Sequence, residues 1–409
     1  MNTCADMELL APAGDFEKLK TAIHYGADAV YLGDSRFSLR GKARNFFPEQ
    51  LKSAIDFCKE KSVKVYVTLN IIPHNRDIDE VIDHIDLLSE ADPDAVIVSD
   101  PGIFSIIRKK MPLMKIHVST QANTTNKASA RFWQDMGASR IVLSRELSID
   151  EIKEIRQSVN IELETFVHGS ICISYSGRCY ISSFLASRGA NMGECTNSCR
   201  WKYTLMEEKR KGEYLPVFED DRGTYIMSSR DLCMIEHLDK LADAGVNSLK
   251  IEGRMKGINY LAGVVKTYRE AVDLLKSCDP YVINPRWMHE LSIFSNRGYT
   301  TGMYLGKQAD ADYNFDGVSY TMECELVGVV QEIKNSIARV GLRSRLDAGD
   351  EVEYLAHGLE GISFIVNEFS DCDGNFADTA RNEDTVFMQV PEGVQPGDLI
   401  RRKASRSVL

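Results

Sequence analysis

The sequence lacks the long apolar segments that would attach it to a membrane or export it. It contains no run of 18 apolar residues, and its N-terminus does not show the basic-then-apolar order of a signal peptide. We therefore expect a cytoplasmic protein with no membrane partner. Because that compartment is reducing, we do not expect the ten cysteines to form disulfides.

Common catalytic motifs are also missing. The chain has no H-E-x-x-H helix of the kind found in zinc peptidases and no G-x-S-x-G turn of serine hydrolases. The first expected strand is not followed by the G-x-G-x-x-G of dinucleotide-binding folds. The net charge of −11 argues against a general nucleic-acid coat protein, but it is compatible with an enzyme that uses one local basic patch.

What the sequence does contain is a regular alternation of short β-branched runs and amphipathic helical stretches through the first 280 residues. This pattern predicts an α/β fold with a parallel sheet. Eight strand–helix units in about 280 residues match a closed, TIM-like (β/α)8 barrel, with a doubly wound open sheet as the alternative. The expected strands cover residues 8–11, 29–33, 64–70, 95–99, 115–120, 140–144, 162–167 and 248–252.

The alternation gives way to short strand-like segments and turns after about residue 320. We expect these segments to form a small all-β C-terminal barrel domain over residues 320–409. Residues 1–280 would form the (β/α)8 barrel, with a cysteine-rich insertion at 169–228, and residues 281–319 would form a linker that packs on the barrel.

The insertion holds the most informative residues of the chain, four cysteines in the pattern C-x6-C-x15-C-x3-C. They are Cys172, Cys179, Cys195 and Cys199. Structural zinc sites usually use closer pairs, so zinc fits this spacing loosely, whereas an iron–sulfur cluster tolerates wider spacing. We interpret the four thiolates as ligands of a metal centre; zinc, or cysteines with a structural or disulfide role, are the alternatives.

The position of the insertion supports a functional role. More than 60 residues separate the strand at 162–167 from the helix expected near 230–244, and connections of that length inside a compact domain are commonly functional. The insertion leaves the carboxyl end of its strand, which is the face where barrel enzymes carry out chemistry.

The expected interior of the barrel is unusually polar. Alternate residues of a barrel strand point into the lumen, and that parity places polar side chains along the third, fifth, seventh and eighth strands. The inward set is Tyr66, Thr68, Asn70, His117, Ser119, Gln121, Glu162, Glu164, His168, Lys250, Glu252 and Arg254. We interpret it as a polar pocket; a buried ion-pair network, such as Glu164 or Glu252 with Lys250, is the alternative.

Within the pocket we assign candidate roles. His168 could act as an acid or base, and the guanidinium of Arg254 could hold a carboxylate or phosphate. Arg145 and Arg40 are further carboxylate candidates on loops at the same face. The candidate catalytic residues are His168, Glu252, Arg254, Lys250 and Glu164, and those for binding a co-substrate are Arg254, Arg145, Gln121 and Asn70. A peptidase that pairs Cys172 with His168 is the competing interpretation.

The stretch ETFVHGSICISYSGRC, from Glu164 to Cys179, resembles the signature of the collagenase-like peptidase family of unknown catalytic class. The opening MELLAPAGDFEKLKTAIHYGADAVYLG and the segments HVSTQANTTN, GTYIMSSRDLC and SLKIEGR are similar to the same family. The resemblance covers residues 7 to about 305, and the C-terminal β module resembles one that many members carry.

The resemblance implies a function that the family name does not suggest. Similar members hydroxylate RNA without O2, drawing on prephenate, and carry a [4Fe–4S] cluster that would map to Cys172, Cys179, Cys195 and Cys199, with Cys233 as an alternative ligand. It implies tRNA as the partner and conversion of the wobble uridine to 5-hydroxyuridine as the reaction. Hydroxylation of 23S ribosomal RNA or of a small molecule, collagenase-like peptidase activity, and a scaffold that works with a paralogous protein partner remain alternatives.

Overall fold

The computed structural model describes residues 7–34, 36–39, 45–172, 174–200, 229–277, 280–306, 322–358 and 360–404, together with the backbone of two short strands, β8 (Phe218–Asp220) and β9 (Gly223–Tyr225). Arg40, one of the predicted carboxylate ligands, lies outside these residues.

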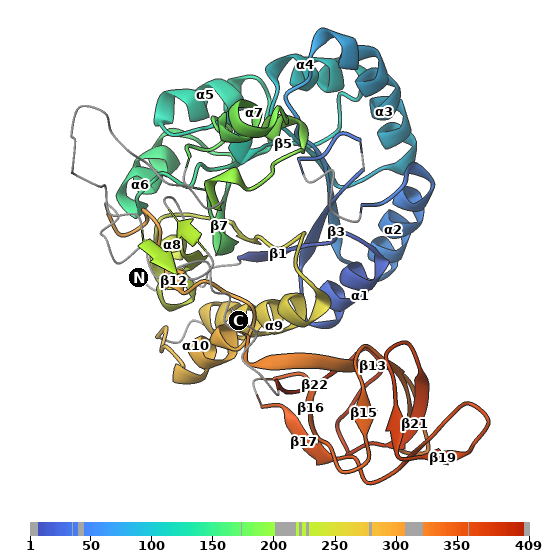
Figure 1. Cartoon of the computed structure of the whole chain (residues 1–409). Helices are drawn as coiled ribbons and strands as arrows, with labels where there is room; N and C mark the ends of the chain where they lie inside the picture. Colours follow the sequence, from blue (N-terminus) through green and yellow to red (C-terminus); the bar gives the residue numbers. More distant parts are fainter. Residues whose placement is uncertain are drawn as a thin grey trace.

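The predicted (β/α)8 barrel is confirmed. Its parallel strands are β1 (Glu8–Pro12), β2 (Ala29–Gly33), β3 (Lys64–Leu69), β4 (Ala95–Val98), β5 (Ile116–Val118), β6 (Arg140–Val142), β7 (Glu162–Ser170) and β11 (Ser248–Ile251). The barrel closes because β11 pairs with both β1 and β7. Figure 1 shows the ring of strands with the helices around it.

Helices cover the outside of the barrel. They are α1 (Phe16–His24), α2 (Pro48–Glu60), α3 (Ile78–Ala91), α4 (Pro101–Lys110), α5 (Lys127–Asp135), α6 (Ile149–Ser158), α8 (Leu238–Asp243) and α9 (Ile258–Lys276). Of these, α1, α4, α5 and α6 begin at a residue whose side chain caps the helix. The carboxylate of Asp15 accepts the Lys18 N–H at 2.8 Å, as expected for the first helix. Pro48 occupies the first turn of α2, where its missing N–H costs nothing.

Two cores stabilise the barrel. The aliphatic side chains that face outward from the strands pack under the helices in one large buried cluster. A small cluster lies inside the lumen and consists of Leu10, Ala29, Tyr31, Tyr66, Ala95 and Ile97. The apolar residues fill only part of the lumen, and the rest of its wall is polar.

The expected helix near 230–244 is only partly correct. Residues 231–233 form a strand, β10 (Asp231–Cys233), that pairs antiparallel with the end of β7, and the helix α8 starts at Leu238. Strand β12 (Tyr299–Thr300), from the segment predicted as a linker, pairs with β10. The same segment contains α10 (Pro285–Ser292), which packs on α9 through the buried Trp287.

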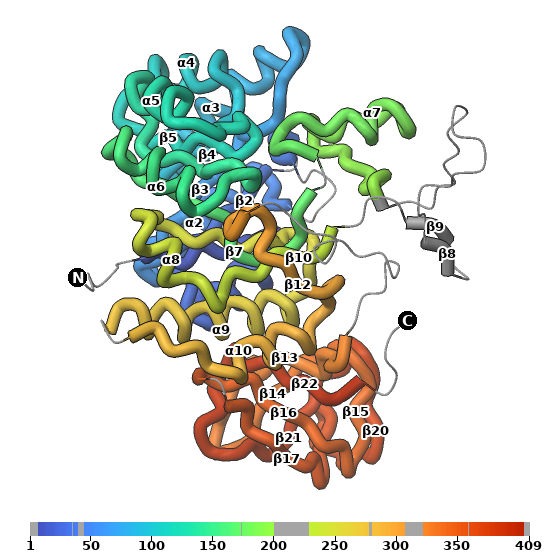
Figure 2. Tube along the Cα trace, turned by 90° about the vertical axis from the view of Figure 1, so that its left-hand side faces the viewer, coloured from blue at the N-terminus to red at the C-terminus, as the bar shows by residue number. Residues whose placement is uncertain are grey.

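The C-terminal residues form the expected all-β module around a core of its own. One antiparallel sheet contains β13 (Cys324–Lys334), β14 (Ile337–Leu342), β16 (Glu351–Leu355), β17 (Ile362–Ile365), β18 (Phe369–Ser370), β19 (Phe376–Ala377), β21 (Thr385–Gln389) and β22 (Leu399–Lys403), and β15 (Leu346–Asp347) pairs with β20 (Thr379–Ala380). The module lies against the barrel beside α9 and α10 (Figure 2). Arg401 donates to Glu290 of α10 at 2.9 Å across this interface.

No helix among the described residues combines the length and apolarity that a membrane crossing needs.

Candidate functional site

A cavity lies at the carboxyl ends of the barrel strands, where the sequence predicts the site. Its volume is about 80 Å³. It brings together seven of the predicted site residues: Asn70, Gln121, Arg145, Cys172, Lys250, Glu252 and Arg254. The predicted polar pocket therefore exists, and one of the four cysteines lines it.

Two arginines of the cavity hold partners that a substrate could exchange. Arg145 Nη2 lies 3.4 Å from Glu252 Oε2, and the guanidinium lies 4.0 Å from the centre of the Phe166 ring. Arg254 donates to the hydroxyl of Thr68 at 3.4 Å and to Asn45. Both cations lie on the cavity wall, and both are suited to binding a carboxylate or phosphate.

Glu164 is part of an ion-pair network rather than of the cavity wall. Its carboxylate is completely buried and contacts Lys250 Nζ at 2.8 Å and Arg140 Nη1 at 3.0 Å. Arg140 also reaches Glu8 at 2.6 Å. The alternative interpretation, a buried ion pair of Glu164 with Lys250, is therefore the one that the structure shows, and it leaves Glu164 without access to a ligand in the cavity. Lys250 belongs to both the network and the cavity.

His168 does not point into the lumen, contrary to the expectation from strand parity. A register shift between β7 and β11 falls between the pairs Lys250–Phe166 and Ile251–His168, so the alternation changes face at this point. The buried ring lies among Tyr260, Tyr268 and Tyr299. Burial lowers the pKa of His168 to about 3, and neither ring nitrogen has a hydrogen-bond partner among the described residues. This position argues against an acid–base role.

The first part of the insertion is fastened across the mouth of the barrel. The carboxylate of Glu146 accepts the Ser176 N–H at 2.6 Å. Gly177, at φ +72°, approaches the carbonyl of Gln121 so closely that any side chain would collide with it. The Ile72 N–H donates to the carbonyl of Asn191 at 3.0 Å, which ties the insertion to the loop after β3. The cysteine-bearing chain is therefore held over the cavity.

The four cysteines of the insertion are all at least partly exposed, and none is in a disulfide. Cys172 follows the end of β7, and Cys179 comes two residues before α7 (Ile181–Ala186). Cys199 belongs to the short helix η4 (Ser198–Arg200), and Cys195 lies between η4 and the short helix η3 (Ala190–Met192); both short helices contact α7. The Asn197 N–H donates to Cys195 Sγ at 3.4 Å, which is the kind of contact that stabilises a ligating thiolate.

The described thiols of the insertion do not converge as they would around a single zinc ion. Thiolates around one tetrahedral zinc lie about 3.8 Å apart. Among the described residues no three cysteine sulfurs lie within 4.8 Å of one another; the one group of potential metal ligands that does is His24, His357 and Asp398, between the barrel and the C-terminal module. In a [4Fe–4S] cluster each cysteine binds a different iron, so the thiolates are spread more widely.

Cys233 lies away from the insertion, on β10. Its sulfur is buried and contacts Tyr268 Oη at 3.8 Å and Met288 Sδ at 3.9 Å. Burial raises the pKa of this thiol to about 11, which disfavours the thiolate that a metal requires. The structure thus gives Cys233 the surroundings of a core residue.

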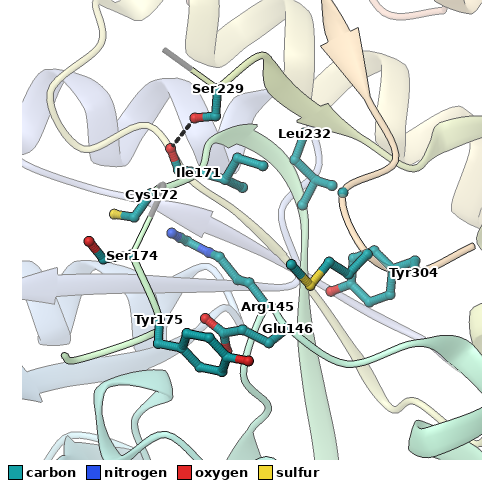
Figure 3. Close-up of a pocket in the computed structure, with 11 residues that line it drawn as sticks. Arg145, Glu146, Ile171, Cys172, Ser174, Tyr175, Ser229, Leu232 and Tyr304 are labelled. Carbon is teal, nitrogen blue, oxygen red and sulfur yellow. Dashed lines mark hydrogen bonds between the residues drawn. The ribbon is translucent and has the colours of Figure 1, made fainter. Parts of the chain in front are cut away.

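A second cavity adjoins the first on the other side of Arg145 and Cys172. Figure 3 shows these two side chains with Ser174, Tyr175 and Glu146 around a shared space. Tyr304, from the segment predicted as a linker, lines the same cavity, and its hydroxyl donates to the carbonyl of Phe166 at 2.8 Å. Cys172 and Arg145 therefore stand between two cavities.

The sequence reasoning missed several residues of the site. Strand parity could have placed Tyr31 and Phe166 in the lumen. There Lys250 Nζ lies 4.4 Å from the centre of the Tyr31 ring and 5.5 Å from the centre of the Phe166 ring. Nothing in the sequence pointed to Tyr304, because its position depends on how the segment after α10 returns to the barrel. The cation–aromatic contacts of Lys250 help to keep its ammonium in the cavity wall.

Taken together, the fold and the site define a class: a (β/α)8-barrel protein with a cysteine-bearing loop over a cationic cavity. The model of Peptidase family U32 matches residues 14–314, and that of the Peptidase family U32 C-terminal domain matches residues 322–401. The chain therefore belongs to peptidase family U32.

Its relatives carry different names. The chain is 38% identical over 400 residues to tRNA hydroxylation protein P1 of Bacillus subtilis, covering 97% of this chain and 94% of that protein. It is 37% identical over 432 residues to tRNA hydroxylation protein P of Escherichia coli, covering 95% and 94%. It is 31% identical over 414 residues to a protein named collagenase from Porphyromonas gingivalis, covering 97% and 98%.

Proposed function

We propose that this chain is a tRNA hydroxylase that converts the wobble uridine to 5-hydroxyuridine without O2, with a [4Fe–4S] cluster and with prephenate as the oxygen source. The observation that carries the proposal is that Cys172 shares one cavity with Arg145, Glu252 and Arg254, in a chain whose full-length relatives include tRNA hydroxylation proteins.

The cations of the cavity suit a dicarboxylate such as prephenate. Arg145 and Arg254 lie on the cavity wall together with Lys250. The Arg145–Glu252 contact of 3.4 Å is loose, so a substrate carboxylate could take the place of Glu252 on the guanidinium. Lys250 remains paired with Glu164 and contributes positive electrostatic potential to the cavity from the lumen side.

Amide side chains of the same cavity suit a nucleobase. Asn70 and Gln121 follow β3 and β5, and each amide offers a donor and an acceptor, as the edge of uracil does. Asn70 Nδ2 donates to Ser119 Oγ at 3.4 Å, which helps to fix the orientation of the amide. A base reaches such a cavity only when it is unstacked from its neighbours, so we expect the uridine to enter extruded from the RNA.

Cys172, Cys179, Cys195 and Cys199 would hold the cluster. When bound, the cluster would supply electron transfer or substrate activation beside the cavity. The protein's own contribution is to hold Cys172 at the mouth, through the Glu146–Ser176 contact and the close approach of Gly177 to Gln121.

Peptidase activity is the second candidate, because one full-length relative is named collagenase. A cysteine peptidase would need a histidine beside Cys172. His168 is enclosed by three tyrosines, while Cys172 is exposed on the insertion, and this geometry supports the hydroxylase over the peptidase.

The proposal is tested by mass spectrometry of total tRNA from cells in which this chain is the only hydroxylase. Cells with C172A and C179A should lack 5-hydroxyuridine, whereas cells with C372A, an exposed cysteine of the C-terminal module, should keep it. Unchanged 5-hydroxyuridine in the first strain, or collagen cleavage by the iron-free protein, would refute the proposal.

A further inference from the structure

The described part of the insertion exposes large apolar side chains that proteins usually bury. Tyr175 is 61% exposed, Tyr180 71%, Phe184 77% and Leu185 44%. All four lie within 11 residues of sequence. A cluster of exposed aromatic residues of this kind is typical of a binding surface. We call Tyr175, Tyr180 and Phe184 the aromatic face.

The orientation of α7 accounts for this exposure. Ser182 is the buried residue of the helix, and its Oγ accepts the Thr196 N–H at 3.3 Å. The side of α7 that faces the protein therefore carries a polar residue, while Phe184 and Leu185 face solvent. This is the reverse of the arrangement of a helix that serves only to cover a core.

One residue of the aromatic face reaches the proposed active site. Tyr175 lines the same cavity as Cys172 and Arg145 (Figure 3). Figures 1 and 2 show α7 at the end of the barrel from which the insertion projects. Phe47 and Met255, each 60% exposed, precede α2 and follow β11 at the same end.

The part of the insertion that carries the cysteines has the opposite charge to the whole chain. Residues 171–200 contain three arginines and one glutamate, whereas the whole chain has a net charge of −11. Arg178 is exposed and lies between Tyr175 and Tyr180 in the sequence, and Arg188 follows α7. Interleaved aromatic and cationic side chains suit single-stranded nucleic acid, because the rings stack on bases while the cations pair with phosphates.

We propose that the aromatic face stacks on unpaired bases next to the target nucleotide, and that Arg178 and Arg188 pair with the adjoining phosphates. This inference rests on the proposed function and adds the surface that would hold the unpaired bases around the target uridine. Bases inside a duplex present only their edges, so paired RNA cannot use this surface. The insertion would then both hold the thiolates and select the single-stranded form of the substrate.

The test is fluorescence anisotropy with a labelled 17-nucleotide stem–loop of unmodified RNA, and with a fully paired duplex of equal length. The full-length protein should prefer the stem–loop. Y180A/F184A should bind the stem–loop roughly 5- to 150-fold more weakly for each lost stack and the duplex as before. F184W should retain binding, whereas F184L should lose it, since leucine keeps an apolar side chain without a stacking surface.

The matched control is F376A, which removes a 74% exposed phenylalanine of β19 on the C-terminal module and should change neither affinity. Equal binding of the two RNAs by the unaltered protein, or full stem–loop affinity in Y180A/F184A, would overturn the inference. Loss of a co-purifying polypeptide with unchanged RNA affinity would identify the face as a protein interface and overturn it as well.

The two proposals fail separately. The binding assay needs neither prephenate nor turnover, so it reports on the aromatic face alone. Normal 5-hydroxyuridine in cells with C172A and C179A would remove the proposed function but would leave the binding preference as measured. Normal 5-hydroxyuridine and normal binding in Y180A/F184A would remove only the inference about the aromatic face.

Discussion

Inside the barrel, the ammonium of Lys250 lies 2.8 Å from a carboxylate oxygen of Glu164, and neither side chain is more than 5% exposed. The pair connects β11 to β7, the two strands whose pairing completes the ring. Arg140 approaches the same carboxylate at 3.0 Å, so one buried anion contacts two buried cations directly below the cavity, and Arg140 also pairs with Glu8.

Removal of that anion should destabilise the barrel strongly. In E164Q the charges of Lys250 and Arg140 lose a partner while remaining buried, so we expect the free energy of unfolding to fall by about 3 to 5 kcal/mol. E162Q is the matched control, because Glu162 is 52% exposed and its pair with Arg140 should contribute less than about 1 kcal/mol. Urea unfolding followed by intrinsic fluorescence measures both, and equal losses would contradict the role given to Glu164.

Arg145 should determine the affinity of the protein for prephenate, the proposed oxygen donor. In R145A we expect prephenate to bind roughly 10- to 150-fold more weakly, which corresponds to the loss of charge-assisted hydrogen bonds. R145K should restore part of this affinity, because it returns the charge without the two-pronged geometry. Isothermal titration calorimetry measures the change, and R131A, on the exposed side of α5, should bind as the unaltered protein does. Normal affinity in R145A would exclude Arg145 as a ligand.

The iron content of cysteine variants should separate the insertion from the core. After anaerobic purification C199A should have lost most of its iron, whereas C233A should retain it, because the Cys233 thiol packs against Tyr268 and Met288. Iron per mole of folded protein is the quantity to compare, with C372A as the control for a cysteine elsewhere on the surface. The opposite result would make Cys233 a ligand.

His168 should make the fold sensitive to acid. Its folded-state pKa of about 3 lies below the unfolded value of 6.5, so the folded protein excludes a proton that the unfolded chain binds. Stability is therefore unaffected by this group above about pH 6.5 and falls as the pH drops from there toward 3, by at most about 1.4 kcal/mol per pH unit.

In H168F this part of the acid slope should disappear, because phenylalanine fills the space among the three tyrosines without a titrating group. The slope due to His117, whose pKa is also lowered by burial and by Arg140, should remain. Urea unfolding at several pH values measures both slopes, with H289F, at an exposed position on α10, as the control. An unchanged slope in H168F would contradict the assignment.

Much of the barrel could be predicted because its signals are local. The β-branched runs and caps such as Asp15 specify where strands and helices lie, and the count of eight units specifies closure. Strand parity also placed Asn70, Gln121 and Lys250 on the cavity correctly. These features depend on few residues at a time, which is why a single sequence contains them.

The errors arose where distant segments meet. Strand parity predicts that His168 faces the lumen, because no residue pattern in the sequence indicates the register shift between β7 and β11. Strand β10 went unrecognised because its three residues gain strand structure only by pairing with β7 and β12. The exposure of Phe184 likewise depends on which side of α7 meets the rest of the insertion, and a six-residue helix carries too little periodicity to decide that.

Strand β7 pairs antiparallel with β10 at the base of the insertion, so the folding of the barrel should not depend on the insertion. Ser170 lies opposite Asp231, and the Ser229 hydroxyl donates to the carbonyl of Ile171 at 2.8 Å. The two ends of the insertion therefore lie side by side at the end of β7. Closing a longer or shorter excursion between fixed ends changes the entropic cost only slowly with length. We therefore expect the barrel to fold when a short Gly-Ser bridge replaces the segment between residues 171 and 229.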